Sequence, residues 1–194
     1  IRFKTSYNIP LDNFVIGRIG QSNQGKWADI LINSFEEIIK EKNKLNFTLL
    51  LVNPPKNIVK SVQYSKAKKN IVIIKKINKD DDLRSAYSSM DIFALAAEQG
   101  ESFGHVLVES MLCEIPVVAL STPWFDNSQC EVVGHMKGGL ICLSPKSFKN
   151  GLIKMIEDKN LRIMLGESAR KKIILSYDYL KVCSDLFEKI SNIE

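Results

Sequence analysis

The sequence contains no long hydrophobic run: nowhere does it approach the roughly 18 successive apolar residues that a membrane-spanning helix needs. It does not open with the pattern of a signal peptide either. Its composition is balanced, with 45% hydrophobic and 25% charged residues over 194 positions, which is typical of a globular domain with a sizeable core. These features predict a cytoplasmic protein without a membrane-spanning segment.

Cysteine is sparse, and the four residues are widely spaced with no CxxC pair among them. This spacing does not match the common zinc-binding motifs and gives no sign of a disulfide framework. Cys113 and Cys142 stand among apolar residues and are expected in the core. A reducing compartment fits this usage.

Aromatic residues make up 8% of the chain and do not alternate with its lysines, which cluster between Lys66 and Lys79 and near Lys171. A groove for single-stranded nucleic acid needs aromatic platforms among its basic residues. We therefore expect no nucleic-acid partner. Basic residues on solvated helix faces explain the net charge of +5 more simply than a nucleic-acid groove does. The same charge is compatible with a weak attraction to an anionic membrane surface.

Short apolar runs alternate with longer amphipathic segments along most of the chain. The runs are rich in β-branched residues and are predicted to be strands covered on both faces, at residues 14–16, 47–52, 71–74, 91–95, 116–120 and 139–142. Helices are predicted between them, at residues 27–42, 56–68, 81–89, 103–113 and 128–134. This alternation indicates right-handed crossovers and a doubly wound α/β sheet.

The tail of the chain shows no strand pattern. From Ser147 to about Ile193 it predicts three successive helices, with the last junction between Tyr177 and Tyr179. No internal linker or repeat divides the sequence. We therefore predict one domain over residues 1–194, a Rossmann-like parallel sheet of about six strands with helices on both faces and a helical C-terminal tail.

Glu109 is the only charged residue in the apolar run from Phe103 to Cys113. A helix that is apolar on nearly all sides belongs inside a domain. A carboxylate there is costly unless hydrogen-bond donors meet it. Because no Arg or Lys lies within a helical turn of Glu109, its partner is either a residue distant in sequence, such as a basic residue in a buried salt bridge, or a ligand with adjacent hydroxyls such as a ribose.

The loop from Gly17 to Lys26 follows a strand and opens a helix, where free backbone amides and the helix dipole bind anions. Arg18 and Lys26 add charges suited to a diphosphate. Residues 20–26 match the start of a P-loop, but Trp27 stands where a Ser or Thr would hold magnesium, and no GxGxxG is present. Neither an NTPase nor a dinucleotide site is predicted, and a glycine-rich turn with solvated basic residues is the structural alternative.

A second group of polar residues runs from Glu101 to Glu109. Ser102 is predicted to cap the helix that follows, so that the amides of residues 103–105 would form another anion-binding terminus. His105 and Glu109 are four residues apart and share a helix face. For His105, a capped or solvent-facing imidazole is the alternative to a binding role.

Two further polar clusters allow structural explanations. The residues from Asp126 to Gln129 would either bind a sugar or cap the next helix. Asp80, Asp81 and Asp82 resemble the DxD pair with which some sugar-nucleotide enzymes bind divalent cations. Their position directly before an amphipathic segment suits a helix N-terminus better, so we predict that they stabilise that terminus and that the protein has no metal site.

Together these residues resemble the C-terminal half of GT-B glycosyltransferases, in particular the large retaining family that includes sucrose and trehalose synthases and bacterial polysaccharide and lipid-glycan enzymes. The resemblance runs from about Asn13 to the C-terminal helices. It rests on the Gly17-Arg18 turn with Lys26, the strand 91–95, the E-x7-E pair Glu101 and Glu109, and the segments 116–119 and 131–133.

The resemblance implies transfer of a sugar from a nucleoside-diphosphate donor, with retention of configuration and without a cofactor or metal. Arg18 and Lys26 would hold the diphosphate, Glu101 the transferred sugar and Glu109 the ribose diol, so Glu101, Arg18 and Lys26 are the expected catalytic groups. Further donor contacts are implied for Gly17, for Ile77 beside the base, and for Ser102, Phe103, Gly104 and His105 near the phosphates or the sugar.

The sequence departs from the family at Glu114, where a glycine is usual, and in the longer spacing from Arg18 to Lys26. The resemblance implies an N-terminal domain that binds the glycan, lipid or protein acceptor, and we expect this domain to lie outside residues 1–194. We therefore predict a donor-binding half that transfers little in isolation. Two alternatives stay open: a non-catalytic interaction module with a degenerate site, and a domain of a non-hydrolysing sugar-nucleotide epimerase.

Overall fold

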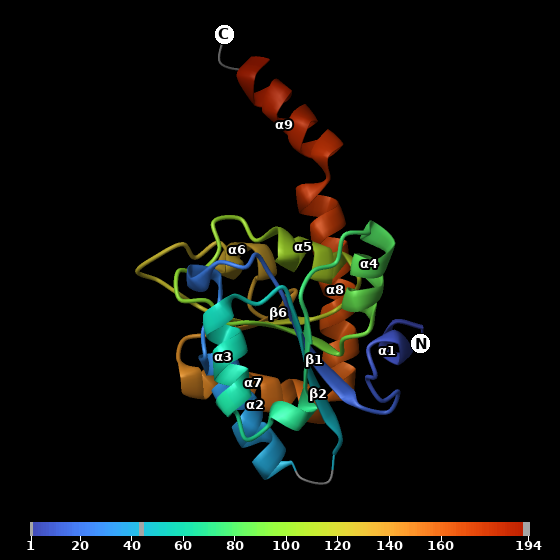
Figure 1. Ribbon diagram of the computed structural model, residues 1–194. Coiled ribbons are helices and arrows are strands. Elements are labelled where there is room, and N and C mark those ends of the chain that lie inside the picture. Colours follow the sequence, from blue (N-terminus) through green and yellow to red (C-terminus); the bar gives the residue numbers. More distant parts are fainter. Residues whose placement is uncertain (1, 43–44, 192–194) are drawn as a thin grey trace.

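Within residues 2–42 and 45–191, which the computed structural model describes, six strands form one parallel sheet (Figure 1). Their order is β3-β2-β1-β4-β5-β6. The strands are β1 (Phe14–Ile19), β2 (Phe47–Val52), β3 (Ile71–Ile74), β4 (Ile92–Leu95), β5 (Val117–Leu120) and β6 (Gly139–Cys142). The chain winds outward from β1 to β3 and then returns to place β4 on the other side of β1, so the predicted doubly wound sheet is confirmed.

Strand β1 continues to Ile19, beyond the predicted run of residues 14–16. The extension pairs with β2 in parallel register, and it carries Gly17 and Arg18 into the sheet. The prediction that the first loop begins at Gly17 is therefore wrong. Glycine and arginine are not typical of a buried strand, so the sequence pattern stopped short of them, whereas β2 offers a partner for every residue of β1.

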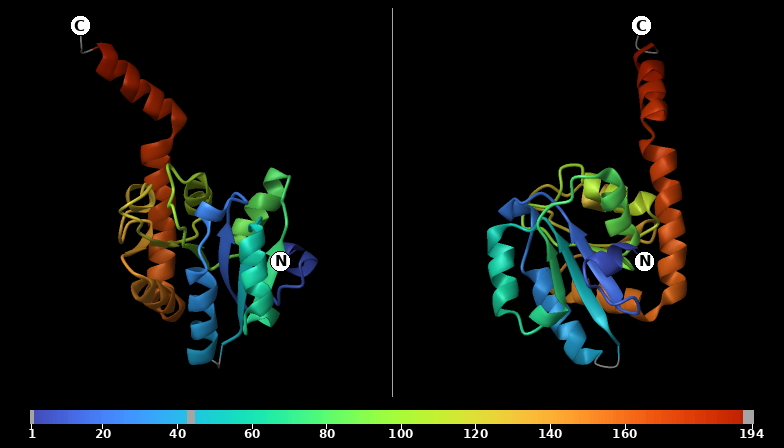
Figure 2. Two further views of the ribbon diagram at one scale, coloured as in Figure 1. Left: turned by 60° about the vertical axis from the view of Figure 1, so that its left-hand side comes forward. Right: turned by 45° about the vertical axis from the view of Figure 1, so that its right-hand side comes forward.

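Helices cover both faces of the sheet, as predicted (Figure 2). On one face, α2 (Ile30–Glu41), α3 (Lys56–Tyr64) and α7 (Pro145–Glu157) share a core cluster with the strands. On the other face, a second cluster is formed with α1 (Arg2–Ser6), α4 (Asp80–Ser88), α5 (His105–Leu112), α6 (Gln129–Val133) and part of α8 (Lys159–Tyr177). The short 3-10 helices η1 (Gln24–Lys26) and η2 (Lys68–Asn70) lie in connections.

Helix α2 shows why these segments turn one side to the sheet. Its buried side chains Leu31, Ile32, Phe35 and Ile38 recur at the spacing of one helical face. Helix α1 was not predicted; it is short, and Phe3 is its one buried residue.

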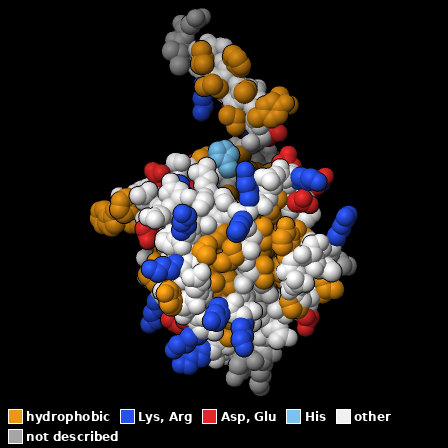
Figure 3. All heavy atoms as spheres, viewed as in Figure 1, with side chains coloured by type: hydrophobic (Ala, Val, Ile, Leu, Met, Phe, Trp, Pro, Cys, Tyr) orange, Lys and Arg blue, Asp and Glu red, His pale blue; other side chains and the backbone are white. Residues whose placement is uncertain are grey.

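The tail folds into α7, α8 and α9 (Tyr179–Ser191), with the last junction at Asp178, as predicted. The predicted end near Ile193 lies outside the described residues. Helix α9 extends away from the sheet (Figures 1 and 2), and hydrophobic side chains are exposed along it (Figure 3). They are Tyr179, Leu180, Val182, Leu186, Phe187 and Ile190. No helix in the described part of the chain is both long and apolar enough to cross a membrane.

Helix α5 ends in a left-handed turn at Glu114, whose φ is 61°. The amide of Ile115 donates to the carbonyl of Ser110, and the amide of Glu114 donates to that of Met111. These two bonds form the Schellman motif, in which glycine is favoured at the left-handed position because a Cβ there is strained. Glu114 therefore adopts the left-handed conformation that the turn requires, although it is not a glycine.

Replacing Glu114 with glycine is expected to raise the free energy of unfolding by about 0.5–1 kcal/mol, because it removes the left-handed strain. Urea denaturation of both proteins measures the change. The matched control is Glu114→Ala, which also removes the exposed 3.7 Å contact with Arg170 but keeps a Cβ in the turn. An equal gain in the alanine variant would contradict the explanation, since backbone strain would then not be the cause.

Candidate functional site

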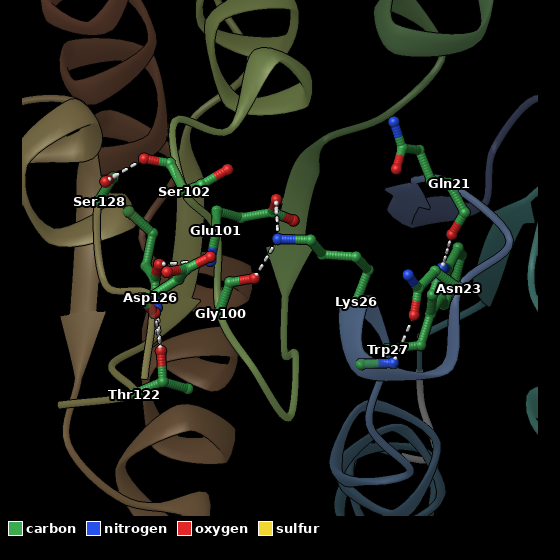
Figure 4. Close-up of polar contacts among 12 residues, drawn as sticks. Gln21, Asn23, Lys26, Trp27, Gly100, Glu101, Ser102, Thr122, Asp126 and Ser128 are labelled. Carbon is green, nitrogen blue, oxygen red and sulfur yellow. Dashed lines mark hydrogen bonds and ion pairs between the residues drawn. The ribbon is translucent and has the colours of Figure 1, made fainter. Parts of the chain in front are cut away.

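Strands β1 and β4 lie side by side in the sheet, and the chain leaves them toward opposite edges. Such a switch point leaves a crevice at the carboxyl ends of the strands. The loops that follow β1 and β4 meet there. The amide of Gln99 donates to the carbonyl of Gly25 at 2.9 Å, and Lys26 Nζ donates to the carbonyl of Gly100 at 2.8 Å (Figure 4).

Arg18 lies beneath this crevice and has no exposed surface. Its Nη1 donates to the carbonyl of Ile19 at 2.8 Å, and its Nη2 donates to the carbonyl of Lys26 at 2.8 Å and to Glu101 Oε1 at 3.2 Å. The guanidinium lies 5.2 Å and 5.6 Å from the ring centroids of Trp27 and Phe93. Burial lowers the pKa of Arg18, and the Glu101 carboxylate opposes that shift.

Glu101 joins the two basic residues predicted for the site. Its side chain is 10% exposed; Oε1 pairs with Arg18, and Oε2 lies 3.3 Å from Lys26 Nζ. Lys26 keeps 20% of its side chain exposed, so it is the member of this group with the most access to solvent. The structure thus brings Arg18, Lys26 and Glu101 together, with two cations on one carboxylate and a net charge of +1.

Gln129 ties the loop after β5 to the same site. Its side chain is fully buried, its Oε1 accepts from the amide of Glu101 at 3.1 Å, and its Nε2 donates to the carbonyl of Leu120 and to Thr122 Oγ1. With both amide atoms bonded inside the fold, Gln129 neither caps α6 nor faces a sugar. It holds the backbone of Glu101 in place.

Glu109 is half-buried on α5, and its Oε2 accepts a hydrogen bond of 2.6 Å from the hydroxyl of Tyr87 on α4. Burial and the carboxylate raise the pKa of Tyr87, so its hydroxyl stays protonated and donates. This partner is distant in sequence, which is one of the two alternatives that the sequence left open. It is not basic, however: no ion pair of Glu109 occurs in the described part of the chain, so the buried salt bridge to a basic residue is wrong.

Helix α5 begins at His105, later than predicted, because Gly104 adopts a left-handed φ of 85° immediately before it. The prediction that Ser102 caps this helix is therefore wrong. Ser102 is exposed, and its carbonyl accepts from the hydroxyl of Ser128 (Figure 4). The N-cap residue, Gly104, has no side chain with which to cap the first turn of α5. That turn lines a hollow of about 130 Å³ together with Gly20, Gln21, Lys26, Glu101, Ser102 and Gly104.

The remaining predicted donor contacts lie at several places. His105 is exposed at the rim of the hollow, its ring 5.0 Å from that of Phe103. Ile77 is half-buried between β3 and α4, against the core cluster that contains Tyr87. Gly17 is buried in β1, where a Cβ would lie 2.1 Å from the sulfur of Met90. The structure therefore gives Gly17 a packing role.

The aspartates of α4 and a second hollow are the other candidates for a functional site. Asp80, Asp81 and Asp82 form the first turn of α4, the helix terminus predicted for them. Within residues 2–42 and 45–191, no group of three or more His, Cys, Asp or Glu side chains could hold a metal ion.

A larger hollow of about 460 Å³ lies between α2 and α7. Among its lining residues, Lys149 pairs with Glu37, but this ion pair is exposed and not buried. The buried charges gather at the switch point instead.

The contacts that Tyr87 and Gln129 make with the candidate site were not predicted from the sequence. Each acts through one hydrogen bond to a residue more than twenty positions away. In the sequence, Tyr87 occupies one apolar position of an amphipathic helix, and Gln129 is one of several polar residues in a loop. No local spacing in the sequence marks either of them.

The sequence matches the profile of the family Glycosyl transferases group 1 over residues 2–172. The capsular polysaccharide biosynthesis glycosyltransferase CapM of Staphylococcus aureus is 26% identical over 166 residues, which cover 84% of this chain and 42% of that protein. The chain spans about half the length of the curated relatives it matches.

Solved structures share the fold. Anabaena Alr3699/HepE, in its complex with UDP and glucose, superposes with a TM-score of 0.81 at 20% identity and covers 98% of this chain and 51% of that one. The C-terminal domain of the glycosyl transferase group 1 family protein LpcC of Francisella tularensis gives a TM-score of 0.76 at 19% identity, with 92% of each chain covered.

Proposed function

The chain belongs to the glycosyl transferases group 1 family, and we propose that it binds a nucleoside-diphosphate sugar whose sugar is transferred to an acceptor with retention of configuration. The observation that carries the proposal is the arrangement at the switch point. One accessible ammonium, on Lys26, lies beside the uncapped first turn of α5, and the half-buried carboxylate of Glu109 stands on the same helix.

A diphosphate matches the positive part of this site. Lys26 and the free amides of a helix N-terminus both favour an anion, and they act without a metal. They would also stabilise the charge that develops on the diphosphate as the sugar leaves. We propose that the diphosphate lies over Lys26 and the start of α5, and that the ribose reaches Glu109.

Arg18 supports the site from beneath. Because it has no exposed surface, we propose that it acts through its bonds to the carbonyl of Lys26 and to Glu101 rather than by touching the diphosphate. Glu101 keeps acceptor capacity beyond its two ionic contacts, since a carboxylate has about four lone-pair positions. We propose that this capacity binds hydroxyls of the transferred sugar.

The acceptor would bind to another part of the whole protein. The chain spans about half of its curated relatives, and helix α9 exposes apolar residues at helical spacing, among them Tyr179, Val182, Leu186 and Ile190. An apolar helix face of this kind is suited to packing against a neighbouring domain. We propose that a domain for a glycan, lipid or protein acceptor packs there, and that the donor half alone transfers little.

Replacing Lys26 with methionine is expected to weaken UDP binding at least about 10-fold, because a hydrogen bond to a charged group is worth about 1.5–3 kcal/mol. Isothermal titration calorimetry with UDP and GDP measures both proteins. The matched control is Lys60→Met on α3, an exposed lysine away from the crevice. If the wild type bound neither nucleotide, the proposed function would be contradicted. If Lys26→Met bound UDP as tightly as the wild type, the proposed role of Lys26 would be wrong.

A further inference from the structure

Tyr87 is the buried group whose position the function above leaves unexplained. It lies on α4 and is only 1% exposed, with its ring 5.9 Å from that of Phe93 on β4. Phe93 also lies under the guanidinium of Arg18. A buried tyrosine hydroxyl needs a hydrogen-bond partner, and Tyr87 finds it in the carboxylate of Glu109 at 2.6 Å. A carboxylate is the strongest kind of acceptor for such a donor.

The bond holds one oxygen of Glu109, and within the described part of the chain no hydrogen bond holds the other. Oε2 accepts from Tyr87, and the side chain of Glu109 is partly open to solvent. A free glutamate would lose rotational freedom on binding a ligand. Glu109 has already lost part of it, because Tyr87 is itself fixed by packing in the core. The carboxylate is therefore presented to a ligand in one orientation.

The charges around Tyr87 keep it in this role. The neighbouring Glu109 disfavours a phenolate, while Arg18, which lies over the ring of Phe93, acts in the opposite direction. Cys113, whose pKa is raised by burial, also faces this group and adds no charge when protonated. Tyr87 thus stays protonated and donates a hydrogen bond to Glu109.

We propose that Tyr87 is a positioning residue that orients the Glu109 carboxylate toward two adjacent hydroxyls, and so sets the preference of the site for a ribonucleotide over a nucleotide without a sugar diol. The inference rests on the proposed function, because it assigns the ribose to Glu109. It adds that the strength of the diol contact depends on a hydroxyl that never touches the ligand.

The test is the variant Tyr87→Phe, which keeps the ring in the core and removes only the hydroxyl. Calorimetry compares UDP with 2′,3′-dideoxyuridine diphosphate, which lacks the diol. We expect UDP to bind the variant about 5–10-fold more weakly than it binds the wild type, and the dideoxy ligand to bind both proteins equally within about twofold. The matched control is Tyr64→Phe, at an exposed tyrosine on α3.

A second comparison separates positioning from a general structural effect. In a Glu109→Ala background, Tyr87→Phe should not weaken UDP binding further, because the group that it orients is gone. An equal loss for both ligands, or no loss for either, would overturn the inference while leaving nucleotide binding intact. A wild-type protein that binds UDP and the dideoxy ligand equally would overturn the assignment of the diol to Glu109, and a wild type that binds neither would overturn the proposed function itself.

Discussion

Replacing Arg18 with methionine is expected to lower the free energy of unfolding by about 3–5 kcal/mol, the usual cost of removing one partner of a buried ion pair. The guanidinium is fully buried, and its loss would leave the carbonyls of Ile19 and Lys26 without their donor and Glu101 with Lys26 as its one remaining cation. Methionine has a similar length, so the change tests charge and hydrogen bonding more than volume.

Urea unfolding of the wild type and the Arg18→Met variant measures the effect. The matched control is Arg84→Met, which removes an exposed pair with Asp81 and should change stability by less than about 1 kcal/mol. Adding Glu101→Gln to Arg18→Met should recover part of the loss, because it removes the charge of a buried carboxylate that is then paired with Lys26 alone. If Arg18→Met were as stable as the wild type, Arg18 would not be the support of the site that its contacts indicate.

The fold could be predicted because each strand is marked by a pattern within its own residues. Apolar runs with β-branched residues, such as those that form β2 and β5, appear in a sequence as strands covered on both faces. The junction between α8 and α9 at Asp178 could also be predicted, because a break in helical periodicity is a local pattern. The end of β1 could not be predicted in this way, because the charge of Arg18 is balanced in the buried strand by Glu101, which lies far along the chain.

The candidate site could be predicted in its location and only partly in its contacts. The switch point follows from the order of strands and helices, and it brings Arg18, Lys26 and Glu101 together. The start of α5 depends on the left-handed turn at Gly104. Ser102 is a common type of helix cap, so the sequence favoured an earlier start. That Tyr87 meets Glu109 depends on how α4 packs beside α5, and no pattern within either helix contains this information.

Replacing Glu109 with alanine is expected to weaken UDP binding about 100-fold, because both hydroxyls of the ribose would lose a charged acceptor. The alanine also leaves the hydroxyl of Tyr87 buried without a partner, which should cost about 1–3 kcal/mol of stability. Calorimetry gives the first quantity, and urea unfolding gives the second.

Glu109→Gln separates these two effects. Its amide oxygen can still accept from Tyr87, so stability should stay close to that of the wild type, while the loss of charge should weaken UDP binding about 10-fold. Were the glutamine and alanine variants both to bind UDP as the wild type does, the carboxylate would have no part in nucleotide recognition.

The most direct test is to follow the backbone amide signals of ¹⁵N-labelled protein by NMR while UDP is added. The account predicts that the largest shifts fall on residues 20–26 and 101–109, around the crevice formed by Lys26, Glu101 and the start of α5. Shifts centred instead on the larger hollow between α2 and α7, or no shifts at all, would contradict it.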